Sequence, residues 1–252
     1  MHAFVTGASA GIGEAIARQL ASEGYDLTLV ARRVDQLERV AAELEGVQTR
    51  VVAADLTKLD TLAGLIREAE AALGPIDVLV NNAGMQIVAR TPNVTPEAAE
   101  RLMTLDLFAP LRLTQAVLPG MIARRAGTIV DIASLAALAP TPGMAHYSAA
   151  KAGLAAASEA LRPELKAQGV HVVTVYPGPV QTRMADAAVD RYDVDPLRGM
   201  PIGTAQGLAR QIGAAIRRRR KRVIYPAAYR LAWHFQGLTN WVVGLASPLP
   251  TE

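Results

Sequence analysis

The segment TGASAGIG, from Thr6 to Gly13, is the strongest single indication of the fold in this sequence. It directly follows the apolar run HAFVT, at residues 2–6, and opens a helical pattern over residues 11–23. Glycines allow a tight turn in which the backbone can approach a pyrophosphate, and the positive end of the following helix favours that anion. The spacing is GxxxGxG rather than the usual GxGxxG. The strand–turn–helix order predicts a parallel α/β sheet that binds a dinucleotide.

The same segment also satisfies GxSxG, the nucleophile elbow of the α/β-hydrolases, with Ser9 as the nucleophile. Such a serine normally follows several earlier strands, whereas only six residues precede Gly7. A hydrolase would also need an aspartate and then a histidine in downstream loops. His146 and His171 instead fall beside or within regular elements. The pattern therefore favours the dinucleotide site.

Strand-like and helical patterns alternate along most of the chain. The Val-, Ile- and Leu-rich runs typical of buried parallel strands are HAFVT, DLTLV, TRVVAA, DVLVN, GTIVDIA and VHVVTVY. Helical stretches between them cover residues 11–23, 34–45, 59–72, 96–121 and 145–167. Repeated βα units predict a parallel sheet with helices on both faces. Beyond Tyr176 the pattern weakens, and we expect residues 177–201 to form a long loop with a short helix.

The composition favours a globular cytoplasmic protein. Of the 252 residues, 51% are apolar and 19% are charged, and there is no cysteine to form a disulfide or a thiolate site. The four histidines lack metal-ligand spacing, so we expect no metal. No apolar run reaches the 18 or so residues of a membrane span, and no signal-peptide pattern precedes the first strand.

The net charge of +3 comes from one segment, RRRRKR at residues 217–222. Without it, 20 basic residues face 23 acidic ones, a net charge of −3. The run is typical of a solvated helix end, where cations complement the helix dipole, and a contact with a membrane surface or a phosphate is the alternative. Aromatic residues do not interleave the run, so we expect no nucleic-acid partner.

Several spaced motifs together resemble the short-chain dehydrogenase/reductase family, in its single-domain branch. They are TGxxxGIG at residues 6–13, Asp55 in AADLT, NNAG at residues 81–84, Ser134, Tyr147-xxx-Lys151, and PGPVQT at residues 177–182. The resemblance is close over residues 3–182. It implies one Rossmann-type, doubly wound α/β domain of about seven strands over residues 1–252. We expect the cofactor-binding and catalytic core in 1–178, a substrate loop in 179–202, and a C-terminal helix, strand and apolar tail in 203–252.

The resemblance implies an oxidoreductase that interconverts a carbonyl and an alcohol by hydride transfer. Its catalytic residues would be Ser134, Tyr147 and Lys151, with Tyr147 as the acid and base and Ser134 as a hydrogen-bond donor to the substrate oxygen. Lys151 and an oxidised nicotinamide ring would lower the pKa of Tyr147 from its usual value of about 10. The implied cofactor-binding residues are Gly7, Ser9, Ala10, Gly11, Ile12, Gly13, Arg32, Arg33, Asp55, Leu56, Asn82, Ala83, Gly84, Tyr147, Lys151, Pro177, Gly178, Val180 and Thr182.

The end of the second strand indicates which nicotinamide cofactor is bound. The segment LVARR, at residues 29–33, lacks the acidic residue that binds the ribose 2′-hydroxyl of NAD, and it carries Arg32 and Arg33. Arginines at this place accommodate a 2′-phosphate. We therefore expect NADP(H).

One residue departs from the family pattern. In MTLDLF, at residues 103–108, Asp106 stands where the family usually has the asparagine of a catalytic tetrad. If only the main-chain carbonyl matters, Asp106 serves equally well. If its carboxylate lies near Lys151, it stabilises the ammonium and alters the proton relay.

The C-terminal tail leaves two interpretations open. Leu231, Phe235, Leu238, Val242 and Leu245 form an apolar stripe at helical spacing, with Trp233 and Trp241 in the same stretch. The stripe covers the substrate cleft or a subunit interface, or it forms an interfacial membrane helix beside the basic run. With the Met-rich loop before it, the tail favours a bulky, apolar substrate. The resemblance implies a homodimer or homotetramer, and the alternative function is a cofactor-sensing protein without turnover.

Overall fold

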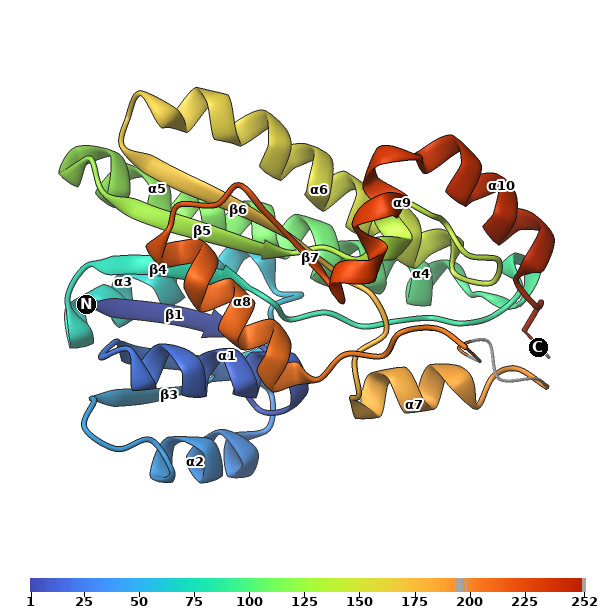
Figure 1. The fold of residues 1–252 in the computed structure, drawn as a ribbon. Helices are drawn as coiled ribbons and strands as arrows, with labels where there is room; N and C mark the ends of the chain where they lie inside the picture. Colours follow the sequence, from blue (N-terminus) through green and yellow to red (C-terminus); the bar gives the residue numbers. More distant parts are fainter. Residues whose placement is uncertain (194–196, 198, 251–252) are drawn as a thin grey trace.

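The computed structural model describes residues 1–193, 197 and 199–250. Its strands form one parallel sheet in the order β3-β2-β1-β4-β5-β6-β7 (Figure 1). The strands are β1 (His2–Thr6), β2 (Asp26–Ala31), β3 (Thr49–Ala53), β4 (Ile76–Asn81), β5 (Gly127–Ile132), β6 (Val170–Pro177) and β7 (Arg222–Tyr225). The six apolar runs found in the sequence correspond to β1–β6, and the predicted doubly wound α/β fold is confirmed.

Both faces of the sheet are buried because each strand sends alternate side chains to opposite sides. Residues that lie side by side across β1, β4, β5 and β6 pack on one face: Phe4, Leu79, Ile129 and Val172. Their neighbours in sequence pack on the other: Val5, Val80, Val130 and Val173. This double burial is why the strands appear in the sequence as continuous apolar runs.

Helices cover both faces (Figure 1). One core contains residues of α1 (Gly11–Ser22), α2 (Val34–Ala42) and α8 (Ala205–Arg217), and the other contains residues of α3 (Leu62–Leu73), α5 (Ala109–Arg124) and α6 (Ala145–Lys166). The remaining helices are α4 (Pro96–Met103), α7 (Arg183–Val189), α9 (Arg230–His234) and α10 (Gln236–Ala246). The loop expected at 177–201 therefore does contain a short helix, α7.

The helix expected over residues 96–121 is divided. A π-helical turn, Thr104–Phe108, separates α4 from α5 and contains Asp106. No sequence pattern predicted this turn, because a π-bulge leaves the helical backbone and the apolar pattern largely intact. Such turns occur frequently at functional sites.

The basic run at residues 217–222 joins α8 to β7 and is only partly a free cationic segment. At its two ends Arg217 pairs with Glu23 and Arg222 pairs with Glu159. Among the described residues, no helix is both long and apolar enough to cross a bilayer.

The strand order determines where a ligand can bind. The chain proceeds outward from β1 through β2 to β3, and then returns to β4 on the other side of β1. The connections that follow β1 and β4 consequently diverge, which leaves a crevice at the carboxyl ends of these strands.

Candidate active site

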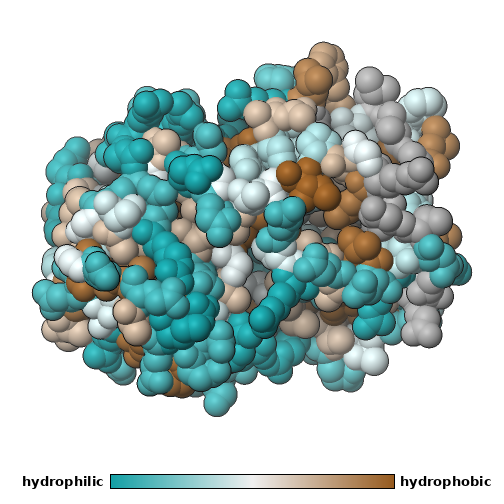
Figure 2. All heavy atoms as spheres, turned by 60° about the horizontal axis from the view of Figure 1, so that its bottom comes forward, coloured by the Kyte–Doolittle hydropathy of each residue, from teal (hydrophilic) through white to brown (hydrophobic). Residues whose placement is uncertain are grey.

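A cleft of about 1310 Å³ lies at the carboxyl ends of the strands. Its walls come from the turn after β1, the ends of β2, β4 and β5, the start of α6, the loop after β6, and α10. Hydrophobic residues are prominent on the right half of the face in Figure 2. Met184 and Met200, which line the cleft, are also exposed. The cleft is large enough to hold a dinucleotide together with a substrate.

The turn between β1 and α1 lines one end of the cleft and packs closely against the NNAG segment. Gly7 and Gly11 have φ angles of 66° and 59°, in the left-handed region that favours glycine. A Cβ atom on Gly13 would lie 2.2 Å from the Gly7 carbonyl oxygen, and one on Gly7 would lie 2.7 Å from Asn82 Nδ2. These glycines thus let the start of α1, where helix amides favour an anion, pack closely against the end of β4.

Asn82 joins the ends of β1 and β4. Its Nδ2 donates to the carbonyl oxygen of Thr6 at 2.9 Å, and its backbone N–H donates to Thr6 Oγ1 at 2.9 Å. The Ala83 N–H donates to the same hydroxyl at 3.0 Å. These hydrogen bonds therefore fix the NNAG segment to the end of β1, and residues 82–84 line the cleft.

The far end of the cleft is cationic. Arg32 and Arg33 both line it and are exposed, and the Arg33 guanidinium donates to Ser9 Oγ at 3.1 Å. Gln36 and Arg39, on the first turns of α2, line the same end. Arg39 is paired with Glu14 and Glu43. Two guanidinium groups beside a buried serine hydroxyl form a site suited to a phosphate.

The opposite end contains the hydroxyl and ammonium groups predicted from sequence. Tyr147 and Lys151 lie one turn apart on α6, and the Lys151 Nζ is 5.8 Å from the centre of the Tyr147 ring. Ser134 follows β5, and its Oγ accepts a hydrogen bond from the Ala136 N–H at 3.1 Å. All three residues line the cleft. The tertiary fold thus brings Ser134, from a strand end, beside the residues of α6.

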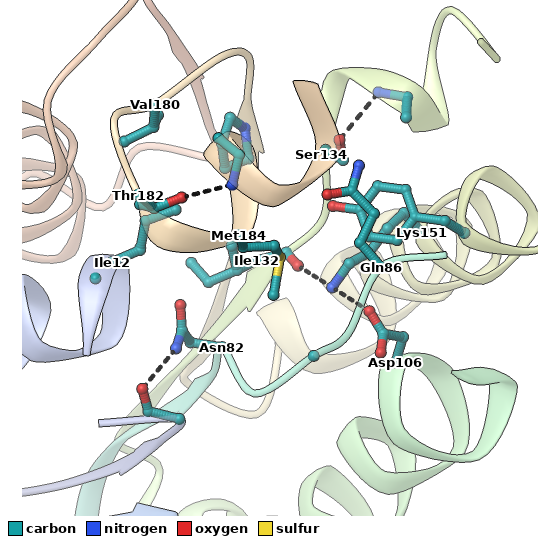
Figure 3. A pocket seen from close by; sticks show the side chains of 18 of the residues that line it. Ile12, Asn82, Gln86, Asp106, Ile132, Ser134, Lys151, Val180, Thr182 and Met184 are labelled. Atoms are coloured by element: carbon teal, nitrogen blue, oxygen red, sulfur yellow. Dashed lines mark hydrogen bonds and ion pairs between the residues drawn. The ribbon is translucent and has the colours of Figure 1, made fainter. Parts of the chain in front are cut away.

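Lys151 is held by a buried ion pair with Asp106. Its Nζ lies 3.2 Å from Asp106 Oδ2 and donates to the Ile132 carbonyl oxygen at 3.0 Å (Figure 3). Asp106 Oδ1 accepts the Met85 N–H at 2.8 Å. A Cβ on Gly84 would lie 2.7 Å from Asp106 Oδ2, so the last glycine of NNAG makes room for this pair. The π-helical turn is what carries the Asp106 side chain to the lysine.

The charges around Tyr147 act in opposite directions. Burial raises the pKa of the Tyr147 phenol above its usual value; the Lys151 ammonium and a hydrogen bond with Ser134 oppose this rise, and the Asp106 carboxylate adds to it. Burial alone would lower the pKa of Lys151, but Asp106 raises it. The predicted lowering of the Tyr147 pKa includes the positive charge of an oxidised nicotinamide ring as well as that of Lys151. In the chain by itself, burial and Asp106 outweigh Lys151.

Comparisons with known proteins agree with this geometry. The family model described as short chain dehydrogenase matches residues 1–193. This chain belongs to the short-chain dehydrogenase family.

Its relatives include oxidoreductases of known structure. Nodulation protein G of Rhizobium sp. strain N33 is 37% identical over 189 residues, covering 75% of this chain and 77% of that protein. A short-chain dehydrogenase from Sphingobium yanoikuyae, in complex with NADPH, is 33% identical with a TM-score of 0.82, over 97% of this chain and 94% of that one. A bulky-bulky ketone specific alcohol dehydrogenase from Comamonas testosteroni is 28% identical with a TM-score of 0.79, over 97% and 94% of the two chains.

Within this short-chain dehydrogenase, the structure places every residue of the predicted site along the cleft. Asp55 is fixed by Thr57, whose N–H and hydroxyl donate to Oδ1 at 3.1 and 2.8 Å, and Leu56 follows it. Val180 and Thr182 lie across the cleft from α1. A Cβ on Gly11 would come within 3.4 Å of Thr182 Cγ2.

Three contributions were not identified from the sequence. Gln36 and Arg39 extend the cationic end, and their spacing from Arg33 on one side of α2 was the available signal. Gln86, two residues after NNAG, points into the cleft beside Ser134 (Figure 3).

Fully buried Asp131 accepts hydrogen bonds from Ser158 and, at 2.7 Å, from Asn81 Nδ2, and it raises the pKa of Lys151. No sequence pattern identified Asp131, because its partners lie on two other elements, β4 and α6.

Proposed function

We propose that the chain is an NADP(H)-dependent oxidoreductase that interconverts a ketone or aldehyde with the corresponding alcohol. The observation that carries this proposal is that one cleft joins two ends of different chemistry. The Ser134, Tyr147 and Lys151 side chains lie at one end, and Arg32 and Arg33 lie at the other with no acidic residue at the end of β2. Consumption of NADPH across a panel of carbonyl compounds tests it.

The residues present fit NADP(H). The glycine turn leaves room for a pyrophosphate against the start of α1, and the NADPH complex of the Sphingobium relative supports the same placement here. Arg32, Arg33 and the Ser9 hydroxyl would hold a 2′-phosphate. Asp55 and Leu56 would contact the adenine, Asn82–Gly84 would pass near the ribose, and Pro177–Thr182 would hold the carboxamide side of the nicotinamide.

In reduction, the cofactor supplies a hydride to the carbonyl carbon. Tyr147 donates its phenolic proton to the carbonyl oxygen and takes a proton back when the alcohol is oxidised. Its raised pKa keeps the phenol protonated at neutral pH, which suits the role of acid. Ser134 donates a hydrogen bond to the same oxygen as negative charge develops there. Lys151, fixed by Asp106 and the Ile132 carbonyl, provides a positive charge beside the phenol and a donor for the nicotinamide ribose.

The Asp106→Asn variant is expected to shift the pH dependence of alcohol oxidation. Oxidation requires the phenolate of Tyr147, so its rate rises with pH through the pKa of that group. The Asp106 carboxylate raises this pKa, so its replacement by a neutral amide lowers the pKa. We expect the rising limb of kcat against pH to move toward lower pH.

The matched control is Asp60→Asn, which removes a carboxylate from the exposed start of the 3₁₀ turn before α3. It should leave the profile unchanged. If the Asp106→Asn profile also stays where it is, the carboxylate does not act on the phenol and only the main chain at this position contributes.

We further propose a bulky, apolar substrate. The part of the cleft beyond Tyr147 is lined mainly by apolar and aromatic side chains: Leu135, Met144, Met184, Val189, Tyr192, Leu197, Met200, Tyr229 and Val243. Methionines adapt to irregular apolar shapes. The similarity to the Comamonas enzyme, which is specific for bulky-bulky ketones, supports the same substrate class. In this proposal residues 179–202 are the substrate loop and residues 203–252 supply the last wall.

A series of ketones of increasing chain length tests the substrate class. Each methylene that becomes buried contributes about 0.8 kcal/mol, so kcat/KM should rise roughly three- to four-fold per added methylene until the cleft is full. Truncation before Tyr229 removes Tyr229 and Val243 from the wall and should flatten the series. A preference of the intact enzyme for small polar carbonyls would refute the apolar substrate.

The natural aspartate at position 106, where the family usually has an asparagine, favours consideration of a second function. In that alternative the protein senses NADP(H) without turnover. Tight NADPH binding with no consumption across the panel would support it. We also propose a cytoplasmic homodimer or homotetramer, because the sequence has no cysteine for disulfides and the family usually forms oligomers.

A further inference from the structure

The C-terminal segment presents large apolar side chains to the outside. Between 58% and 70% of the surface of each of five residues is exposed: Leu231, Phe235, Trp241, Leu245 and Leu249. We call these five residues the tail face. Leu231 is on α9 and Phe235 directly follows that helix, one turn further along the chain, while Trp241 and Leu245 are one turn apart on α10. Large exposed apolar groups gathered in this way mark interaction sites. The stripe predicted from sequence also included Leu238 and Val242, whose side chains lie outside the described residues.

The same helices are anchored by other residues. Thr239, Val243 and Ser247, spaced one turn apart, line the cleft. On α9, the Trp233 ring packs on Tyr176, with 5.3 Å between ring centres, and the Arg222 guanidinium lies 4.5 Å from the Trp233 ring centre. Other residues of the tail therefore make these contacts with the rest of the protein, and the five side chains of the tail face remain exposed.

A basic groove lies beside the tail face. It has a volume of about 230 Å³, and it is lined by Gln211, Arg220, Arg222, Val223, Ile224, Arg230 and His234. Arg222 is paired with Glu159, whereas no described acidic side chain pairs with Arg220 or Arg230. The sequence contains no acidic residue from 196 to 251. Arg230 and His234, at the two ends of α9, are each followed directly by a tail-face residue, so the groove and the apolar groups adjoin along this short helix.

We propose that the tail face and the basic groove dock on an anionic lipid membrane. The apolar side chains enter the interfacial region of the bilayer, and Arg220 and Arg230 contact lipid phosphates. A second copy of the chain fits less well, because a symmetric contact through this region would bring the same unpaired cations toward one another. Since α10 lines the cleft with one side and carries Trp241 and Leu245 on another, docking places the cleft beside the lipid.

Vesicle binding tests this proposal without any assay of activity, so its failure is separate from failure of the proposed function. The full-length protein is sedimented with vesicles of phosphatidylcholine alone and of phosphatidylcholine with phosphatidylglycerol. We expect binding to the anionic vesicles, weakened by salt because the cationic contacts are screened. The two tryptophans give a second readout. Trp241 should show a blue-shifted emission on binding, and Trp241→Phe should abolish the shift because Trp233 is packed inside.

Paired variants separate the two contributions. Trp241→Ser with Leu245→Ser should abolish binding to anionic vesicles. Arg220→Gln with Arg230→Gln should weaken it tenfold or more, since each cation near a membrane surface contributes about a factor of five. The control Arg67→Gln with Arg112→Gln makes the same charge change at exposed positions on α3 and α5 and should bind as the wild type does.

Two results would overturn the proposal. One is the absence of binding to either vesicle by the wild-type protein. The other is a dimer that light scattering detects for the wild type and not for the Trp241→Ser, Leu245→Ser variant, with no vesicle binding by either, which would assign the tail face to a second copy.

Discussion

Tyr147→Phe is expected to lower kcat for carbonyl reduction by about 10²- to 10⁴-fold while leaving NADPH binding within a few-fold of the wild type. The substitution keeps the ring, and with it the packing beside Lys151 on α6, but removes the only proton that this side chain can transfer. Stopped-flow single-turnover rates with saturating NADPH measure the loss at the chemical step. Fluorescence titration with NADPH measures binding on the same samples.

The control for this variant is Tyr25→Phe. Tyr25 is a buried tyrosine between α1 and β2, outside the cleft, so the same loss of a hydroxyl there should leave kcat unchanged. Turnover of Tyr147→Phe at the wild-type rate would show that another group is the acid. Ser134→Ala then becomes the variant to examine, because its hydroxyl is the other group predicted to contact the substrate oxygen.

Changing both Arg32 and Arg33 to alanine is expected to weaken NADPH binding by roughly ten- to a hundred-fold and to leave NADH binding nearly unchanged. Only NADPH carries the 2′-phosphate that the two guanidinium groups would contact. In the wild-type protein NADPH should therefore bind markedly more tightly than NADH. Calorimetric titration of both cofactors against both proteins gives the four dissociation constants.

Arg67→Ala serves as the matched control, since Arg67 is an exposed arginine on α3 on the other side of the sheet. It should change neither affinity. Equal affinities of the wild type for NADPH and NADH would refute the cofactor assignment. A loss of both affinities in the double variant would mean instead that the arginines support the fold of the turn, with Ser9, rather than a phosphate.

The parts of this short-chain dehydrogenase that were predictable are those determined by local sequence. A fully buried parallel strand needs apolar residues on both faces, so β1 to β6 could be located from their Val, Ile and Leu runs alone. The glycine turn after β1 could be found because only glycine tolerates its positive φ angles and its close contacts with Asn82. Tyr147 and Lys151 share a helix face at a spacing of four, so their proximity needed no tertiary structure.

The tertiary structure alone decided the electrostatics of the site. Asp106 reaches Lys151 because a π-helical turn carries it there and Gly84 leaves room, and the π-turn has no distinctive hydrophobic period. Whether the pKa of Tyr147 is raised or lowered depends on its burial and on charged groups from separate elements. The sequence does not show how far those groups lie from the phenol. The apolar stripe of the tail was likewise visible in the sequence. Which side chains of the tail face the cleft and which face outward depends on how α9 and α10 pack against Tyr176 and the cleft wall. Contacts within a few residues follow from backbone geometry, whereas contacts between distant elements follow from how the whole chain fills space.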